Sequence, residues 1–194
     1  IVPDVLVKFS GRAWHVHLND QIYKGLSINP YYASLDLSQE MDKSTQQYLR
    51  QRMNEANDLL RAVHRRHNTL LKLAVLLIRY QSGFLHVGTP GLKPLTMAAL
   101  AEQAGVHPST VTRAAAGKYI QTPRGIYTWN FFFPQALSTI HGKETTDAYV
   151  RMRIGQMIAE EDPDQPLSDQ NLAEKLQQEG ICIARRTVAK YRTD

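Results

Sequence analysis

The chain is 194 residues long, hydrophobic residues make up 43% of it, and its formal net charge is +5 with a pI near 9.4. This composition excludes wholesale disorder, and the excess of positive charge favours a polyanionic partner. The single cysteine, Cys182, excludes an internal disulfide and a multi-cysteine zinc site. We expect a packed thiol there, in a cytoplasmic protein. The most apolar run, residues 70–78, is too short to cross a bilayer, so we expect no membrane span.

Charge is distributed unevenly along the chain. Residues 1–95 carry twelve Lys or Arg against seven Asp or Glu, and residues 97–140 carry three against one. Residues 141–180 carry four against nine, and residues 181–194 return to four against one. An acidic segment therefore separates two basic ones. Because the chain begins with Ile1 rather than Met, we also expect a fragment or a processed form of a longer protein.

The first predicted element is a β-hairpin over residues 4–18. Val5, Val7 and Phe9 alternate with polar neighbours, Ser10–Gly11 supplies a turn, and the alternation resumes after it. Alternation of this kind is typical of a strand with one buried face.

An antiparallel or consecutive pair of helices is predicted next. Apolar residues spaced by four and three run from Leu49 to Val63 and form one stripe along a helix. The His64–His67 segment interrupts the pattern, and Asn68–Thr69 would cap a second helix that ends near Ile78. The basic pair inside His64–His67 indicates solvated or partner-facing charge rather than a metal site.

The clearest pattern is a helix-turn-helix that follows a linker or tight loop over residues 83–94. A small residue at Ala101, a glycine at Gly105 and a branched residue at Val111 have the spacing that two touching helices need. Pro108 suits the start of the second helix, which His107 or Ser109 would cap. Side chains able to bond bases or phosphates then face outward: Ser109, Thr110, Thr112 and Arg113.

A basic turn and a strand should complete this region. Lys118 and Arg124 would reach phosphates from the turn, and residues 126–133 are rich in β-branched and aromatic residues, as a strand is. We expect Trp129 and the Phe131–Phe133 aromatics to cap the core rather than to bind a partner.

A second unit with the same plan is predicted near the C-terminus, after a boundary at residues 141–143. One helix is expected around residues 150–158, followed by a solvated acidic bend at residues 160–164. Ser168 or Asp169 would cap the next helix, and Gly180 would end it. A terminal helix over residues 185–192 would press Val188 against this unit and turn its cations outward.

The terminal stretch 184–192, ARRTVAKYR, resembles the signature box of the enhancer-dependent bacterial sigma factor family, sigma-54 or RpoN. The resemblance continues in residues 107–125, HPSTVTRAAAGKYIQTPRG, which are similar to the central helix-turn-helix of that family. Weaker matches lie at Arg66, at residues 69–71, and at residues 3–5, 18–19 and 28–29, the last three resembling the polymerase-binding segment.

The resemblance implies a mainly α, multi-domain fold with helix-turn-helix units and small β-hairpins. Residues 1–82 would be part of the core RNA polymerase-binding region, residues 83–140 the central helix-turn-helix domain, and residues 141–194 the RpoN-box domain. The terminal helix would recognise the upstream GG element of a promoter, and the central unit would lie near the downstream GC element. An activator ATPase is expected as a partner of the full-length family member, although the activator-responsive region is absent here.

The function implied is promoter recognition within a polymerase holoenzyme, without catalysis by this chain and without a cofactor or metal. We expect Arg186 to contact bases, with Arg185 and Arg192 flanking it at the DNA backbone. The residues expected to bind DNA are Arg185, Arg186, Thr187, Lys190, Tyr191, Arg192, His107, Ser109, Thr110, Thr112, Arg113, Lys118 and Arg124.

Two other classes of function stay open at this stage. A stand-alone helix-turn-helix repressor or partition-type protein would bind a palindromic operator as a dimer, whereas two unlike units in one chain predict an asymmetric site. An enzyme of nucleic-acid metabolism is disfavoured because the sequence has no phosphate-binding glycine loop and no zinc-deaminase signature.

Overall fold

The structure is a computed structural model, and it describes residues 1–19, 26–35, 42–137, 139, 145–162 and 165–193. The fold is mainly α, as predicted. The helices are α1 (Pro30–Leu35), α2 (Lys43–Tyr80), α3 (Ser82–Val87), α4 (Met97–Ala104), α5 (Pro108–Ala115), α6 (Asp147–Ala159), α7 (Asp169–Gln178) and α8 (Arg185–Thr193), with 3-10 turns η2 (Thr89–Gly91) and η3 (Trp129–Phe132). The strands are β1 (Val5–Ser10), β2 (Ala13–Leu18), β3 (Tyr119–Thr122), β4 (Gly125–Thr128), β5 (Ala136–Leu137) and β6 (Thr145–Thr146).

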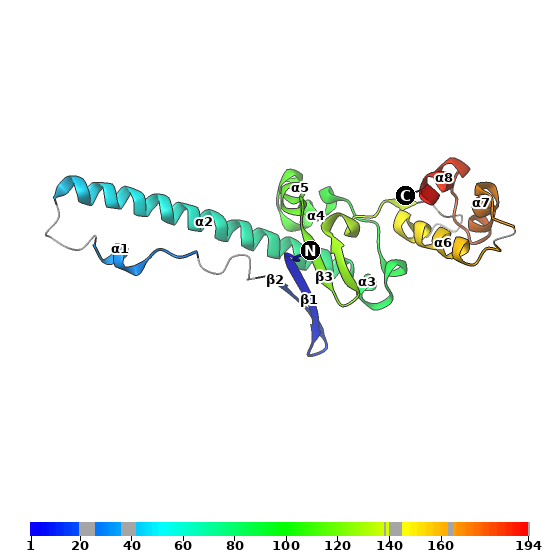
Figure 1. Ribbon diagram of the computed structural model, residues 1–194, viewed down its shortest axis with the longest axis horizontal. Coiled ribbons are helices and arrows are strands. Elements are labelled where there is room, and N and C mark those ends of the chain that lie inside the picture. The colour runs from blue at the N-terminus through cyan, green and yellow to red at the C-terminus, as the bar shows by residue number, and fades with distance from the viewer. Residues whose placement is uncertain (20–25, 36–41, 138, 140–144, 163–164, 194) are drawn as a thin grey trace.

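The molecule is elongated (Figure 1). The long helix α2 projects from one side of a central body that contains the sheet and helices α3 to α5. Helices α6 to α8 form a separate body on the opposite side. We call residues 82–137, together with strands β1 and β2 and the end of α2, the central unit. Residues 145–193 are the C-terminal unit.

The predicted break in the long helical region is wrong, because α2 is one helix of 38 residues. No glycine or proline lies between residues 43 and 80, so nothing forces the backbone to leave the helix. The proposed cap residue Thr69 lies inside the helix, where its hydroxyl donates to the Arg65 carbonyl at 2.8 Å. The start of α2 is capped instead by Asp42, which accepts from the Thr45 amide.

The predicted hairpin is confirmed and forms half of a four-stranded sheet. Strands β1 and β2 pair antiparallel from Val5↔Leu18 to Ser10↔Ala13, around a two-residue turn with positive φ at Gly11 and Arg12. The sheet order is β2-β1-β3-β4, and β1 runs parallel to β3. The start of the chain is therefore built into the sheet beside the predicted helix-turn-helix.

One hydrophobic core joins the N-terminal residues to the central unit. Buried side chains from β1, the end of α2, α3 to α5, β3 and η3 belong to the same cluster, from Val5 to Phe132. Gln81, fully buried, bonds the Lys93 carbonyl at 2.8 Å and the Phe132 carbonyl at 2.9 Å, and it accepts from the Lys93 amide at 2.9 Å. The boundary between residues 82 and 83 is consequently not a boundary between separate cores.

The C-terminal unit has its own core, as predicted. Its buried residues come from all three helices and the segment before α8, and they are Val150, Ile154, Met157, Leu172, Leu176, Ile181 and Val188. The Arg153 side chain bonds both carboxylate oxygens of Glu179, which ties α6 to the end of α7 and raises the pKa of Arg153. The predicted boundary at residues 141–143 lies outside the described residues.

Three local predictions are corrected by the structure. The expected loop at residues 83–94 contains α3 and η2, because Phe84 and Leu85 are buried in the core. The expected strand at residues 126–133 is shorter, because β4 ends at Thr128 and the chain continues as η3. Trp129 and Phe132 of η3 are fully buried and cap the core, as predicted. Cys182 is exposed, since its extended neighbour Ile181 takes the inward position.

Candidate nucleic-acid interface

Helices α4 and α5 form the predicted helix-turn-helix. Gly105 between them has φ +65, a conformation that costs a residue with a side chain, and its amide donates to the Ala101 and Glu102 carbonyls. His107 caps α5 by accepting from the Ser109 amide at 3.2 Å. Ala101 and Val111, the two predicted contact positions, are both buried.

The exposed face of α5 lies opposite Val111. At roughly 100° per residue, Ser109 and Arg113 lie about 160° and 200° around the axis from Val111. Both are exposed, and Arg113 Nε donates to the Ser109 carbonyl at 3.2 Å. Thr112 is also exposed and Thr110 is half-buried at the edge of this face. The structure therefore brings four of the predicted DNA-binding residues together.

Helix α2 extends this face with two arginines that the predicted site does not include. An open hollow of about 450 Å³ between α2 and α5 is lined by Arg65, Arg66, Thr69, Thr110, Arg113 and Ala114. Guanidinium and hydroxyl donors from two helices face one hollow, which is a suitable environment for an anion. The available signal was the basic pair within His64–His67, but the sequence does not show that this pair lies beside α5.

In the C-terminal unit, α8 presents a second cationic face. Val188 is fully buried, and Arg186 and Lys190 lie about 160° and 200° around the axis from it. Within the described part of the chain, three side chains of α8 are exposed and make no hydrogen bond or ion pair: those of Arg185, Arg186 and Lys190. Tyr191 is half-buried under the Arg151 guanidinium, 4.3 Å from the ring centroid, and Thr187 is also half-buried. The outward cations of α8 are thus free to meet a partner.

Three predicted DNA-binding cations are bonded to other parts of the chain, although Arg124 and Arg192 are exposed and Lys118 is half-buried. Lys118 Nζ lies 2.6 Å from Asp4 Oδ1, and both side chains are largely buried. Arg124 donates to the Leu85 carbonyl at 3.3 Å and to the His86 carbonyl, at the C-terminal end of α3. Arg192 donates to the Leu167 carbonyl at 2.8 Å.

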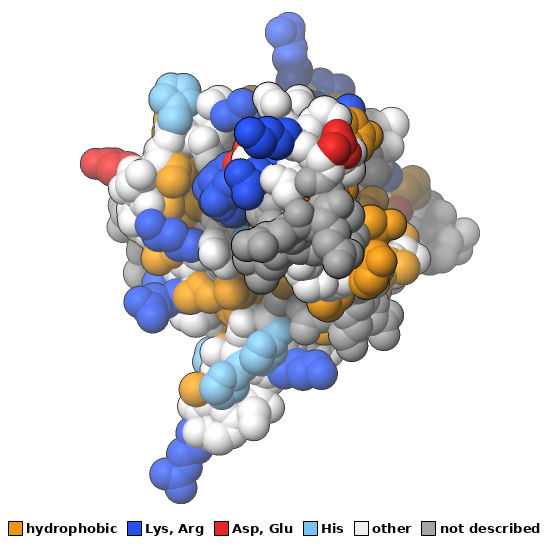
Figure 2. All heavy atoms as spheres, turned by 90° about the vertical axis from the view of Figure 1, so that its left-hand side faces the viewer, with side chains coloured by type: hydrophobic (Ala, Val, Ile, Leu, Met, Phe, Trp, Pro, Cys, Tyr) orange, Lys and Arg blue, Asp and Glu red, His pale blue; other side chains and the backbone are white. Residues whose placement is uncertain are grey.

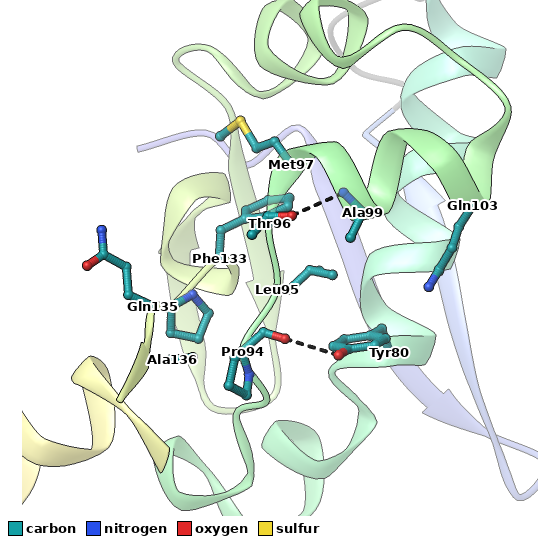
Figure 3. A pocket seen from close by; sticks show the side chains of 11 residues that line it. Tyr80, Pro94, Leu95, Thr96, Met97, Ala99, Gln103, Phe133, Gln135 and Ala136 are labelled. Atoms are coloured by element: carbon teal, nitrogen blue, oxygen red, sulfur yellow. Dashed lines mark hydrogen bonds between the residues drawn. The ribbon is translucent and has the colours of Figure 1, made fainter. Parts of the chain in front are cut away.

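A groove of about 600 Å³ marks the junction of the central unit with the segment that leads to the C-terminal unit (Figure 3). Its walls come from the end of α2, the start of α4 and residues 133–136. Tyr80 donates to the Pro94 carbonyl at 3.0 Å, and Thr96 caps α4 by accepting from the Ala99 amide at 3.1 Å. The first bond ties the end of α2 to the segment before α4, and the second begins α4.

The described helices include none with the length and apolar character to span a membrane. Among the same residues, no three His, Cys, Asp or Glu side chains are grouped as metal ligands.

Residues 46–194 match the model of the family described as Sigma-54, DNA binding domain. The chain is 40% identical to the RNA polymerase sigma-54 factor of Acinetobacter guillouiae over 191 residues, which cover 98% of this chain and 39% of that protein. It is 38% identical to the RNA polymerase sigma-54 factor of Azotobacter vinelandii over 192 residues, which cover 99% of this chain and 38% of that protein. The chain therefore spans about two fifths of the length of these relatives.

The fold is similar to the crystal structure of Aquifex aeolicus sigmaN bound to promoter DNA. The TM-score is 0.59 at 28% sequence identity, and the match covers 99% of this chain and 57% of that chain. The extent of the family match, the identity to these relatives and the shared architecture agree with the box at residues 184–192. The chain belongs to the sigma-54 family.

Proposed function

We propose that this chain is the promoter-recognising part of a sigma factor and that it binds DNA through α5 and α8. The observation that carries the proposal is the pair of exposed faces, each placed opposite a buried valine. Arg186 and Lys190 lie on one face, and Ser109 and Arg113 lie on the other. The similar sigmaN structure contains promoter DNA, which supports the same class of ligand.

The two faces differ chemically, so they suit different parts of an asymmetric site. Helix α8 carries free cations, and an arginine that bonds guanine O6 and N7 together contributes about 1–3 kcal/mol of discrimination. We therefore assign α8 to the upstream GG element, with Arg186 as the base contact. The smaller polar side chains of α5 and the arginines of the neighbouring hollow suit a backbone-rich contact at the downstream GC element.

The assignment is tested with Arg186→Ala and Lys190→Ala in the full chain. Each variant is titrated against a promoter duplex and against the same duplex with the GG pair replaced. We expect Arg186→Ala to weaken binding to the intact duplex roughly 5- to 150-fold and to change binding to the altered duplex much less. Lys190→Ala should weaken both duplexes alike and reduce the salt slope by about one. Equal weakening of both duplexes by Arg186→Ala would make Arg186 a phosphate contact.

A second part of the proposal is that residues 1–82 contact core RNA polymerase. Of the ten large apolar side chains that are exposed in the described part, eight lie within residues 1–82. Viewed towards the free end of α2, the surface shows apolar side chains interspersed with Lys and Arg (Figure 2). The concentration of exposed apolar side chains in this part of the chain, together with the resemblance of residues 3–5, 18–19 and 28–29 to a polymerase-binding segment, supports a protein partner there.

The polymerase contact is tested with surface variants of the whole chain, because residues 1–82 share a core with the central unit. We expect the double variant Tyr48→Ser with Leu59→Ser to reduce capture by core polymerase while its promoter binding is retained. The matched control is Val87→Ser with Ile126→Ser, which changes two exposed apolar residues outside residues 1–82. Equal capture of both double variants would place the contact elsewhere.

A further inference from the structure

The Arg192 side chain lies at a junction of three segments of the C-terminal unit. Its Nη1 donates to the Leu167 carbonyl at 2.8 Å and lies 3.3 Å from Asp169 Oδ1, at the start of α7. Its Nη2 lies 4.0 Å from Glu161 Oε1, in the turn after α6. The other Glu161 oxygen accepts from the Leu167 amide at 2.9 Å. The end of α8 is thereby bonded to the segments that follow α6 and begin α7.

Glu161 is not the solvated acidic residue that its sequence context predicts. Its side chain is 16% exposed, against 35% for Arg192 and 27% for Asp169. A carboxylate with this little exposure, bonded to a backbone amide and next to a guanidinium, is a structural group. It holds the acidic turn against α8.

The geometry of α8 also directs Arg192 toward the body of the unit. Arg192 lies four residues after Val188, about 40° around the axis from this buried residue, whereas Arg186 and Lys190 lie on the far side. When the two units are aligned on Val111 and Val188, Arg192 corresponds to Ala115, which is 3% exposed. The position is on the packing face in both units, and in the C-terminal unit it is filled by a cation with acidic partners.

We propose that Arg192 is a positioning residue that holds α8 at its angle, with Glu161 and Asp169 as its partners, and that it does not contact DNA. The three bonded segments orient α8 so that Arg186 and Lys190 point outward. The effect on DNA binding that we expect from Arg192 rests on the proposed function. It excludes Arg192 from the DNA contacts that the basic box predicts.

The test compares Arg192→Met and Glu161→Gln in the full chain, with Lys190→Met as the matched control. Thermal unfolding of the C-terminal unit and affinity for a GG-containing promoter duplex at several salt concentrations are both measured. We expect Arg192→Met and Glu161→Gln each to lower the unfolding temperature and weaken DNA binding, with an unchanged salt slope. The double variant should be little worse than either single variant, because both remove the same interaction. Lys190→Met should reduce the salt slope by about one and leave the unfolding temperature unchanged.

A phosphate contact by Arg192 would give the opposite pattern. Arg192→Met would then reduce the salt slope by about one, and Glu161→Gln would leave stability unchanged or strengthen DNA binding by removing a negative charge. Either of these results overturns the proposal. Glu161→Gln keeps the acceptor for the Leu167 amide, so it remains a usable variant if Arg192→Met does not fold. The coupling measured by unfolding does not depend on DNA, so a failure of the unaltered chain to bind promoter DNA would count against the proposed function alone.

Discussion

Gly105 shows how one residue fixes the angle between two helices. Its φ of +65 ends α4 and turns the chain into His107, the cap of α5. A β-carbon at this glycine would meet no atom within 4 Å, so the restriction is conformational and not steric crowding. At this scale, the bonds that a charged side chain makes also depend on a few particular partners. Lys118 is paired with Asp4, whereas Arg192 is bonded to the Leu167 carbonyl and lies beside Asp169 and Glu161.

We expect Gly105→Ala to lower the free energy of unfolding of the central unit by about 1–2 kcal/mol, because the left-handed conformation is costly with a side chain. Gly155→Ala is the matched control, since Gly155 lies inside α6 and a β-carbon there also meets no neighbouring atom. That change should raise the stability of the C-terminal unit by up to about 1 kcal/mol. Urea unfolding measures whether each variant lowers or raises the free energy of unfolding. Equal destabilisation by both would contradict the conformational explanation.

Helix α2 illustrates how an element can be long without being buried along its length. Its buried residues, Leu70, Leu73, Ala74, Leu77 and Ile78, all lie in its C-terminal part, which is the part packed on the central unit. The stripe from Leu49 to Val63 is only half-buried. Amphipathic spacing therefore predicted the helix correctly, but it did not distinguish a face packed on this chain's own core from a face left accessible to a partner.

The N-terminal turn of α2 should depend on pH. Hydrogen bonds from the Ser44 hydroxyl and then from Thr45 lower the pKa of Asp42 from 3.8 to about 2. Because the folded-state pKa is depressed, the contribution of this cap is complete above pH 3.8 and is lost as the pH falls through about 2. An NMR titration of the Asp42 carboxyl, with amide exchange at Thr45, measures this. Thr96 caps α4 without an ionisable group and serves as the control, and titration of Asp42 near 3.8 would contradict the cap.

On the scale of the whole molecule, two cores carry the two faces that we assign to DNA. They are connected by the pairing of β5 with β6 and by Asp147, whose carboxylate accepts from the Gln135 amide at 2.8 Å and whose own amide donates to the Gln135 carbonyl at 3.1 Å. Helix α6 also contacts η2 of the central unit. The distance between the two faces depends on this junction, and under the proposed function it would set the spacing of the two promoter elements.

Separate cores predict separate unfolding transitions. Leu172 and Leu100 are both fully buried, one in each core, so replacement by alanine should cost about 2–5 kcal/mol in each case. We expect Leu172→Ala to lower only the transition of the C-terminal unit and Leu100→Ala only that of the central unit. Scanning calorimetry of the two variants distinguishes the transitions. A single transition lowered by both changes would show that the junction makes the units cooperative.

The local elements could be predicted from the sequence because their causes are local. The helix-turn-helix spacing around Gly105, the Ser168 cap and the α8 seam at Val188 all depend on residues within a few positions of one another. For the same reason the sequence by itself determined the family, through the box at residues 184–192. A short polar segment at residues 64–69 predicts a break in α2, but no residue in it disrupts a helix, so the helix continues through it.

Only the tertiary structure decided which of the predicted cations are bonded to other parts of the chain. Asp4 pairs with Lys118 because β1 pairs with β3, and Arg65 and Arg113 line one hollow because α2 packs on α5; the residues of each pair are distant in sequence. Such partners are brought together by burial of a shared core, which no periodicity along the chain records. The sequence by itself determined that α8 is a basic amphipathic helix with Val188 on its inner side. Only the tertiary structure decided that Arg192, unlike Arg186 and Lys190, is bonded to neighbouring segments, because folding brings the turn after α6 and the start of α7 beside the end of α8.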